Sequence, residues 1–244
     1  MLARLDTTGQ DSDMRSRSRP RGLPGTIFRA TLAALLALVF GVGGLIVIYR
    51  FEPPVSTLML ARRLLGDAVD RQYVPLDRIS LSLRAAVLVS EDARFCQHDG
   101  VDWGALREVL DTSKPGGPSR GASTIPMQIA KNLFLWPSRS YIRKIIEIPL
   151  ALLLDLAWSK RRILEVYLNI AEWGDGIFGA EAAARHYFHK SADRLDAREA
   201  ALLATALPSP AHRNPAKPSP RHAGLAARVM ARARGADSLI ACVK

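Results

Sequence analysis

The sequence predicts a mainly α-helical protein with one membrane-spanning helix near its N-terminus. Apolar residues recur at three- and four-residue intervals, as at Leu83, Ala86 and Val87, which is the period of a helix face. Alternation over the length of a strand is scarce. Residues 30–49 hold no charged side chain, and a helix of that length crosses the hydrocarbon layer of a bilayer, which is about 30 Å thick.

The apolar run divides the chain into three parts. We expect a disordered cytoplasmic tail over 1–25, a transmembrane signal-anchor over 26–50 and one domain over 51–244. An uncleaved anchor is favoured over a cleaved signal peptide, because the run is long and no A-x-A site follows it. Arginines cluster on its N-terminal side, at Arg15, Arg17, Arg19, Arg21 and Arg29. This bias predicts a single-pass protein of the inner (cytoplasmic) membrane, with residues 51–244 in the periplasm.

The formal net charge of +11 admits nucleic acid, anionic lipid or phosphorylated substrates as partners. The predicted topology disfavours nucleic acid, since an exported domain seldom meets DNA, and favours the membrane and lipid-linked phosphates. Cys96 and Cys242 could pair in an oxidising compartment, but nothing in their spacing requires it. Two free, buried thiols are the favoured interpretation.

The first cluster of candidate site residues is SEDARFCQHDG, residues 90–100. It holds Glu91, Asp92, Phe95 and His98, which in a cleft would form a general base with its supports and on a solvated helix face would have no such role. Neighbours on a helix point about 100° apart, so the two acids are not expected to work as a pair. We expect Asp92 to cap or brace the segment.

The second cluster is RGASTIPMQIAKNLFLW, residues 120–136. Ser123 or Thr124 is a good helix N-cap, and Pro126 then falls in the first turn, where its missing N–H is harmless. Thr124, Gln128 and Lys131 follow one polar stripe. With Arg120 and Lys131, the helix start would form a phosphate cradle; an ordinary capped amphipathic helix is the alternative.

The third cluster follows at residues 139–174. Arg143 and Lys144 precede Glu147 by four and three positions, so the three share a helix face. A surface ion-pair triad is the alternative interpretation. Pro149 should kink this helix because it cannot donate the i−4 hydrogen bond. Beyond it, residues 222–234 could form a basic terminal helix.

The segment 174–179 satisfies G-x-G-x-x-G but follows a helical pattern rather than a strand of a βαβ unit. We therefore expect a tight helix–loop–helix link and no nucleotide cofactor. His186 and His189 lack the partners of a catalytic zinc site.

In their order and spacing, these clusters resemble the family 51 glycosyltransferases, the peptidoglycan glycosyltransferase module. The signature EDxxFxxHxG matches Glu91 to Gly100, RGxSTIxxQxAKNLFL matches Arg120 to Leu135, and RKxxE matches Arg143 to Glu147. Two further signatures run from Lys160 to Ala184 and over 201–210. The chain is similar to the monofunctional branch, since the transpeptidase motifs SxxK and KTG do not occur in it. Met127 stands where relatives often have glutamine.

The resemblance implies a lysozyme-like helical head with a smaller, membrane-proximal hydrophobic jaw. It also implies the reaction: the 4-hydroxyl of lipid II attacks the anomeric carbon of a lipid-linked glycan, with inversion and loss of undecaprenyl pyrophosphate. Glu91 would be the base, with Phe95 and His98 shaping its pocket, and Glu147 would assist departure. The implied substrate-binding residues are Arg120, Ser123, Thr124, Gln128, Lys131, Asn132, Arg143 and Lys144. The loop 113–122 would be a flexible gate.

A divalent cation, Mg²⁺ or Mn²⁺, is the implied cofactor, with Glu147 as its candidate ligand. Implied partners are lipid II, the lipid-linked glycan, the membrane and other cell-wall synthesis proteins. Two alternatives remain. A lytic transglycosylase would share the glutamate but would not need the cluster of Lys131, Arg143 and Lys144. A non-catalytic wall-assembly protein would not need the base.

Overall fold

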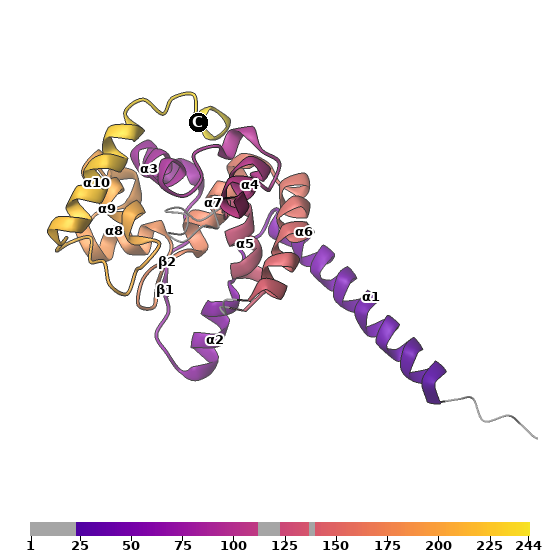
Figure 1. The fold of residues 1–244 in the computed structure, drawn as a ribbon. Helices are drawn as coiled ribbons and strands as arrows, with labels where there is room; N and C mark the ends of the chain where they lie inside the picture. Colours follow the sequence, from indigo (N-terminus) through magenta and orange to yellow (C-terminus); the bar gives the residue numbers. More distant parts are fainter. Residues whose placement is uncertain (1–22, 112–122, 137–139) are drawn as a thin grey trace, which may run out of the picture. The chain divides into compact units, whose positions relative to one another are not determined.

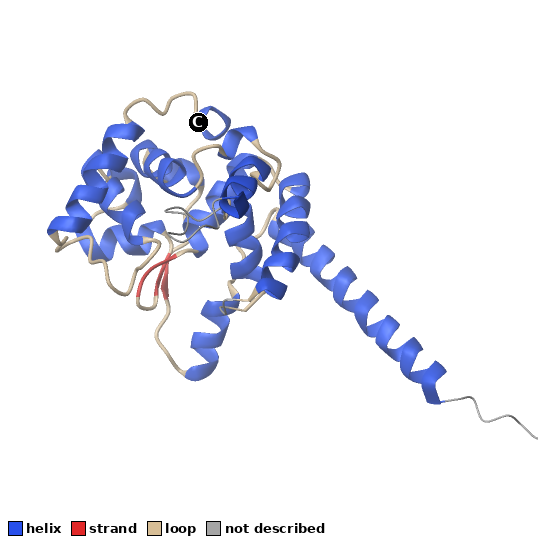
Figure 2. Ribbon diagram, in the orientation of Figure 1, coloured by secondary structure: helices blue, strands red, loops and turns tan. Residues whose placement is uncertain are grey.

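The structure is a computed structural model that describes residues 23–111, 123–136 and 140–244. The predicted gate, 113–122, lies outside the described residues, and so does the predicted tail apart from residues 23–25, which begin the first helix. Where it is described, the chain is mainly helical, as predicted (Figure 2).

The first helix, α1 (Leu23–Tyr49), carries the apolar run. Its segment Gly25–Tyr49 is long and apolar enough to cross a membrane, and among the described residues it is the stretch that meets both conditions. This agrees with the predicted single-pass anchor.

One group of helices packs around α3 (Leu81–Glu91), which contacts α9 (Ala197–Ala206) and α10 (Pro220–Ala233), while α9 and α10 also contact each other (Figure 1). Helix α3 begins after Ser80, whose hydroxyl accepts from the Leu83 amide at 3.1 Å. Every residue from Leu83 to Val89 is buried, so α3 is enclosed on all sides. The predicted basic terminal helix is α10.

A second group is built on α5 (Ile125–Phe134), which packs against α6 (Tyr141–Ala157), α7 (Lys160–Ile170) and α2 (Thr57–Leu65). Helix α7 also contacts α8 (Ala180–Phe188). The connections carry α4 (Trp103–Asp111) and short 3-10 helices, η1 (Leu76–Arg78), η2 (Phe95–Gln97), η3 (Ala192–Arg194) and η4 (Ala241–Val243).

The helix–loop–helix link predicted over 174–179 is wrong. A small sheet in the order β1-β3-β2 lies there, formed by β1 (Asp70–Arg71), β2 (Glu172–Gly174) and β3 (Ile177–Phe178). Strands β2 and β3 are antiparallel and β1 is parallel to β3. Gly176 turns the hairpin with φ +71°, and a Cβ there would lie 2.6 Å from the Ala68 carbonyl oxygen. Gly176 therefore serves a hairpin turn, while Gly174 belongs to β2 and Gly179 is the N-cap of α8.

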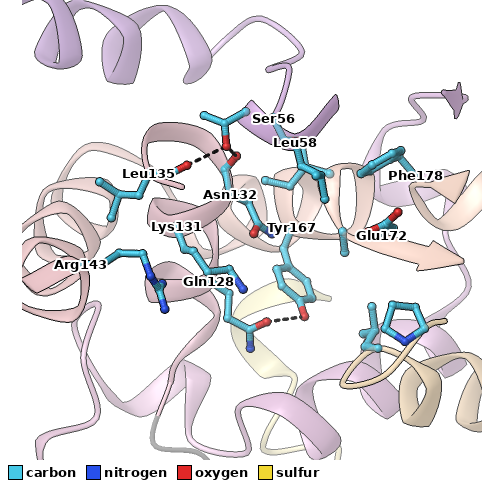
Figure 3. Close-up of a pocket in the computed structure, with 15 residues that line it drawn as sticks. Ser56, Leu58, Gln128, Lys131, Asn132, Leu135, Arg143, Tyr167, Glu172 and Phe178 are labelled. Carbon is cyan, nitrogen blue, oxygen red and sulfur yellow. Dashed lines mark hydrogen bonds between the residues drawn. The ribbon is translucent and has the colours of Figure 1, made fainter. Parts of the chain in front are cut away.

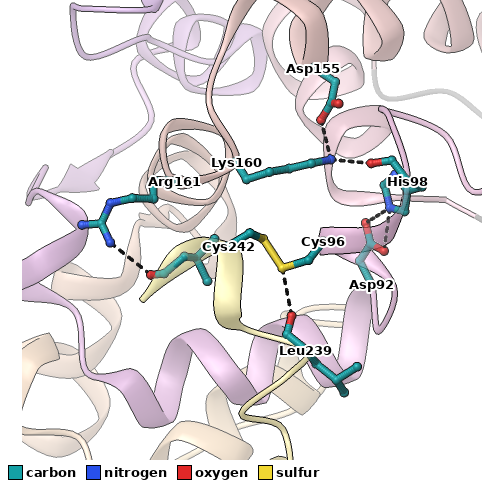
Figure 4. Close-up of a disulfide and its surroundings, with 9 residues drawn as sticks. Asp92, Cys96, His98, Asp155, Lys160, Arg161, Leu239 and Cys242 are labelled. Atoms are coloured by element: carbon teal, nitrogen blue, oxygen red, sulfur yellow. Dashed lines mark hydrogen bonds and ion pairs between the residues drawn. A yellow bond between two sulfur atoms is a disulfide. The ribbon is translucent and has the colours of Figure 1, made fainter.

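The prediction of two free thiols is also wrong. Cys96 and Cys242 form a disulfide, with their Cα atoms 5.8 Å apart (Figure 4). The bond joins η2, within the first cluster, to η4 at the C-terminal end, across a sequence separation of 146. Such a pairing arises only because the chain beyond α10 folds back, which spacing alone does not reveal.

Candidate active site

Glu91 is the last residue of α3, where the enclosed helix ends. Its Oε2 accepts a hydrogen bond from Gln128 Nε2 at 3.2 Å, and its Oε1 lies 3.4 Å from the Ser90 hydroxyl. Burial raises the pKa of Glu91 above its ordinary value, although the hydrogen bonds from Gln128 and Ser90 oppose the shift. A carboxylate with a raised pKa is suited to accept a proton near neutral pH.

Asp92 braces the loop, as predicted. Its carboxylate accepts from the Ile125 amide at 2.9 Å, at the start of α5, and lies 3.0 Å from His98 Nε2. His98 is therefore held by Asp92, while Phe95 is fully buried and meets the His98 ring edge to face. Neither of them is among the residues that line the pocket described below.

Lys160 secures the same loop from the start of α7 (Figure 4). Its ammonium donates to the His98 carbonyl at 2.5 Å and to Asp155 at 2.7 Å, and it lies 5.0 Å from the centre of the Phe95 ring. The helix start after Ser159 therefore fixes the loop that follows Glu91. The sequence placed Lys160 in a motif without assigning it this contact.

Thr124 is the N-cap of α5, and its hydroxyl accepts from the Met127 amide at 3.3 Å. The same hydroxyl donates to the Gly100 carbonyl at 2.6 Å, so Thr124 is buried and ties the loop to the helix. Gly100 has φ +78°, and a Cβ there would lie 2.6 Å from the Ala151 carbonyl oxygen of α6. The loop after Glu91 thus contacts both α5 and α6.

Arg143, Lys144 and Glu147 share one face of α6, as predicted, but they do not form a surface triad. Glu147 is only 2 % exposed, and its carboxylate lies between Arg143 and the Lys144 ammonium, 3.0 Å away. The Lys144 ammonium also donates to Ser123 Oγ at 2.8 Å. The α-helix continues through Pro149 to Ala157.

Three positive charges lie close together here, namely Lys131 on α5 and Arg143 and Lys144 on α6. Burial lowers the pKa of Lys144 to about 8, helped by the neighbouring charges of Arg143 and Lys131. Burial also lowers the pKa of Lys131; Arg143 adds to this shift and Glu91 opposes it. The carboxylates near these three cations do not balance their positive charge. The cluster therefore favours an anionic ligand.

A pocket of about 370 Å³ opens beside these groups (Figure 3). Four predicted residues line it, namely Gln128, Lys131, Asn132 and Arg143. The remaining wall comes from the start of α2, the end of α5, the C-terminal part of α7, the hairpin and the segment after α9, through Ser56, Thr57, Leu58, Leu135, Tyr167, Ile170, Ala171, Glu172, Phe178, Leu207 and Pro210. Arg120 lies outside the described residues.

Tyr167 was not predicted as a site residue. It is buried, with only 1 % of its surface exposed, but its hydroxyl reaches the pocket. Thr57 was missed as well; its hydroxyl lies 3.1 Å from the Asn132 carbonyl and 2.8 Å from the Leu135 carbonyl, which fixes α2 to the end of α5. No sequence signal pointed to either contact.

The Glu91 carboxylate can accept a proton, and it is hydrogen-bonded to Gln128, which lines the pocket. Lys131 and Arg143 make part of the pocket wall positively charged. A ligand anion can be neutralised by Lys131, Arg143 and Lys144 while Glu91 accepts a proton from a hydroxyl. That combination suits the displacement of a phosphorylated leaving group by an alcohol.

Comparison with known proteins agrees with this geometry. The sequence model of the Transglycosylase family matches residues 58–234. The biosynthetic peptidoglycan transglycosylase of Brucella suis biovar 1 (strain 1330) is 51 % identical over 222 residues, which cover 90 % of this chain and 99 % of the relative. That of Rhodopseudomonas palustris (strain HaA2) is 52 % identical over 213 residues, 86 % and 94 % of the two chains. That of Agrobacterium fabrum (strain C58 / ATCC 33970) is 48 % identical over 220 residues, 89 % and 97 %. The chain therefore belongs to the transglycosylase family, and it is similar to these biosynthetic peptidoglycan transglycosylases over almost their whole length.

Proposed function

We propose that this chain is a monofunctional peptidoglycan glycosyltransferase of bacterial cell-wall synthesis. It polymerises lipid II into β-1,4-linked glycan strands and releases undecaprenyl pyrophosphate. The observation that carries the proposal is the half-buried Glu91, which accepts a hydrogen bond from Gln128 in the wall of a pocket that Lys131 and Arg143 also line. The family match and the names of the relatives support the reaction class.

In the proposed mechanism Glu91 is the base. Its carboxylate takes the proton from the 4-hydroxyl of lipid II as that oxygen attacks the anomeric carbon of the lipid-linked glycan. Attack from the face opposite the pyrophosphate inverts the anomeric centre. Burial raises the pKa of Glu91, which makes its carboxylate a stronger base than an exposed glutamate.

The cations act on the leaving group. Lys131, Arg143 and Lys144 neutralise the pyrophosphate, whose negative charge grows as the glycosidic bond breaks. Glu147 is placed to hold Arg143 and Lys144 at the required spacing, since its carboxylate contacts both. Ser123 orients the Lys144 ammonium from the other side.

We expect any stimulation by Mg²⁺ or Mn²⁺ to come from a cation that arrives with the pyrophosphate. Within the described residues, no three His, Cys, Asp or Glu side chains are grouped to hold a metal ion, and Glu147 is already faced by two cations. The residues present therefore do not fit a protein-held metal. The Glu147→Gln variant should keep the same fold-response to a chelator as the unaltered protein; loss of that response would make Glu147 a metal ligand.

Several features support placement of the domain outside the cytoplasm. The arginines before α1 predict that orientation, and the Cys96–Cys242 disulfide is typical of an oxidising compartment. Helices α2 and α6 also expose apolar side chains that suit a membrane surface, as at Leu64, Leu65, Tyr141, Ile142, Ile145, Leu153 and Leu156. We assign these helices to the hydrophobic jaw expected near the membrane, where the chain would meet lipid II and other wall-synthesis proteins.

Purified full-length protein incubated with lipid II in detergent tests the activity. We expect glycan polymer and released undecaprenyl pyrophosphate, and a loss of about 10²–10⁴-fold in rate for Glu91→Gln. Glu108→Gln, on the exposed face of α4, is the matched control for the loss of one glutamate charge. Solubilisation of intact peptidoglycan without polymer formation would favour a lytic enzyme, and normal turnover by Glu91→Gln would exclude Glu91 as the base.

A further inference from the structure

A chain of three side chains reaches from α7 to the proposed base. The Tyr167 hydroxyl donates to Gln128 Oε1 at 3.1 Å, and Gln128 Nε2 donates to Glu91 Oε2 at 3.2 Å. The three residues come from α7, α5 and α3. Figure 3 shows the first of these hydrogen bonds, between two side chains that line the pocket.

The Tyr167 hydroxyl is a dependable donor. The residue is 1 % exposed, and burial together with the nearby charges of Glu91 and Asp92 raises its pKa well above 10. The hydroxyl therefore keeps its proton throughout the range in which an enzyme works. Its position is fixed too, because its neighbours on α7 from Val166 to Ile170 are all buried.

Gln128 is the adjustable member. A side-chain amide has an acceptor on one side and donors on the other, and rotation by half a turn exchanges them. A carboxylate only accepts, so Nε2 must face Glu91 for the contact to be favourable. With no donor opposite Oε1, Gln128 would be free to turn toward the Lys131 side of the pocket that it lines.

We propose that Tyr167 is a positioning residue, which orients the Gln128 amide so that its Nε2–H group holds the Glu91 carboxylate. Tyr167 does not touch the reacting atoms; it acts through Gln128. Glu91 is thereby held by Gln128 at Oε2, with Ser90 beside Oε1. The inference rests on the proposed role of Glu91 as base, and it adds a residue that lies 76 positions further along the chain and fixes the orientation of that base.

A double-mutant cycle tests it, with Tyr167→Phe, Gln128→Met and the double variant in the full-length protein. Tyr167→Phe removes one oxygen atom, and Gln128→Met keeps the side-chain length but cannot donate. The readouts are kcat, KM for lipid II and the acid limb of kcat/KM against pH, which reports the free-enzyme pKa of the base.

We expect Tyr167→Phe to lower kcat about three- to tenfold, the range for loss of one neutral hydrogen bond, with little change in KM. The acid limb should move to higher pH, because a carboxylate that loses a hydrogen-bond donor is less stable in its charged form. In the Gln128→Met background, Tyr167→Phe should change neither kcat nor the position of the acid limb, because the residue through which Tyr167 acts is gone.

The matched control is Tyr187→Phe, which removes a hydroxyl that donates to the Trp173 carbonyl at 3.2 Å elsewhere in the domain. It should leave the acid limb unchanged. Gln128→Asn is a second way to break the chain with Tyr167 intact, and it should reproduce the upward shift even where Tyr167→Phe proves hard to fold.

Full additivity in the cycle, or an acid limb that stays in place in both Tyr167→Phe and Gln128→Asn, would overturn the inference. Failure of the proposed function has a different signature, namely normal turnover by Glu91→Gln. An inactive Glu91→Gln with an additive cycle would leave Glu91 as the base and remove Tyr167 from the mechanism.

Discussion

The Lys144 ammonium and the Glu147 carboxylate lie 3.0 Å apart, one turn apart on α6, in a region where Glu147 is almost wholly buried. This pair settles the choice left open by the spacing of Arg143, Lys144 and Glu147. Exposed ion pairs of this kind contribute little to stability, whereas a buried carboxylate that contacts two cations fixes where those cations point. The cluster is therefore a buried support beside the pocket, which Arg143 lines, rather than a surface feature.

The pKa of Lys144, lowered to about 8, predicts an alkaline limit on activity. The protonated ammonium is the form that neutralises pyrophosphate, so kcat/KM should fall as pH rises through about 8. Lys144→Arg keeps the charge to much higher pH and should extend the plateau upward, whatever its effect on the maximum rate. The pH profile of kcat/KM for lipid II checks this. An alkaline limb that stays in place in Lys144→Arg would assign it to another group.

Asp92→Asn should destabilise the protein and lower its activity together. The Asp92 carboxylate accepts from the Ile125 amide at 2.9 Å and faces His98 at 3.0 Å in a buried position. Loss of hydrogen bonds to a charged group costs about 1.5–3 kcal/mol in the free energy of unfolding. Thermal unfolding of the solubilised protein measures the change, with the exposed Asp99→Asn as control. Equal unfolding temperatures for Asp92→Asn and the unaltered protein would show that the hydrogen bonds of Asp92 do not contribute this stability.

Local sequence patterns predicted the helical parts of this site well. The cap at Thr124, the proline in the first turn of α5 and the shared face of Arg143 and Glu147 all follow from contacts within four residues. The period of 3.6 residues fixes such relationships whatever the rest of the chain does. The spacing does not show whether a helix face meets solvent or another part of the chain. For this reason the sequence left open an exposed position for Glu147.

The features that the sequence did not predict depend on distant parts of the chain. Strands of two or three residues are too short to show alternation, so the sheet at Ile177 and Phe178 had no signal. The Cys96–Cys242 bond and the contact between Tyr167 and Gln128 join segments that only the tertiary fold brings together. Tyr167 shows the difficulty best, because its ring belongs to the core and its hydroxyl to the site.

Removal of the disulfide should lower stability more than activity. A bond that closes a loop this long restricts the unfolded chain, and loss of a native disulfide typically costs about 2–5 kcal/mol. The double variant Cys96→Ser, Cys242→Ser should therefore unfold at a lower temperature than the oxidised protein. Reductant should lower the unfolding temperature of the unaltered chain but not that of the double variant. Unfolding in the presence and absence of reductant checks both statements. A reductant effect that persists in the double variant would have another cause.

The apolar face of α6 should govern access to membrane-bound substrate. Tyr141 is 92 % exposed and Leu156 85 %, near opposite ends of the helix, which is unfavourable in water and favourable against lipid. Leu156→Asn should reduce the rate with lipid II in vesicles severalfold, with a smaller effect in detergent micelles, where the substrate does not have to be taken from a bilayer. Leu81→Asn, which alters an exposed leucine at the start of α3, is the matched control and should affect both assays equally. Equal losses in vesicles and micelles for Leu156→Asn would place the effect in the fold of α6 rather than at the membrane.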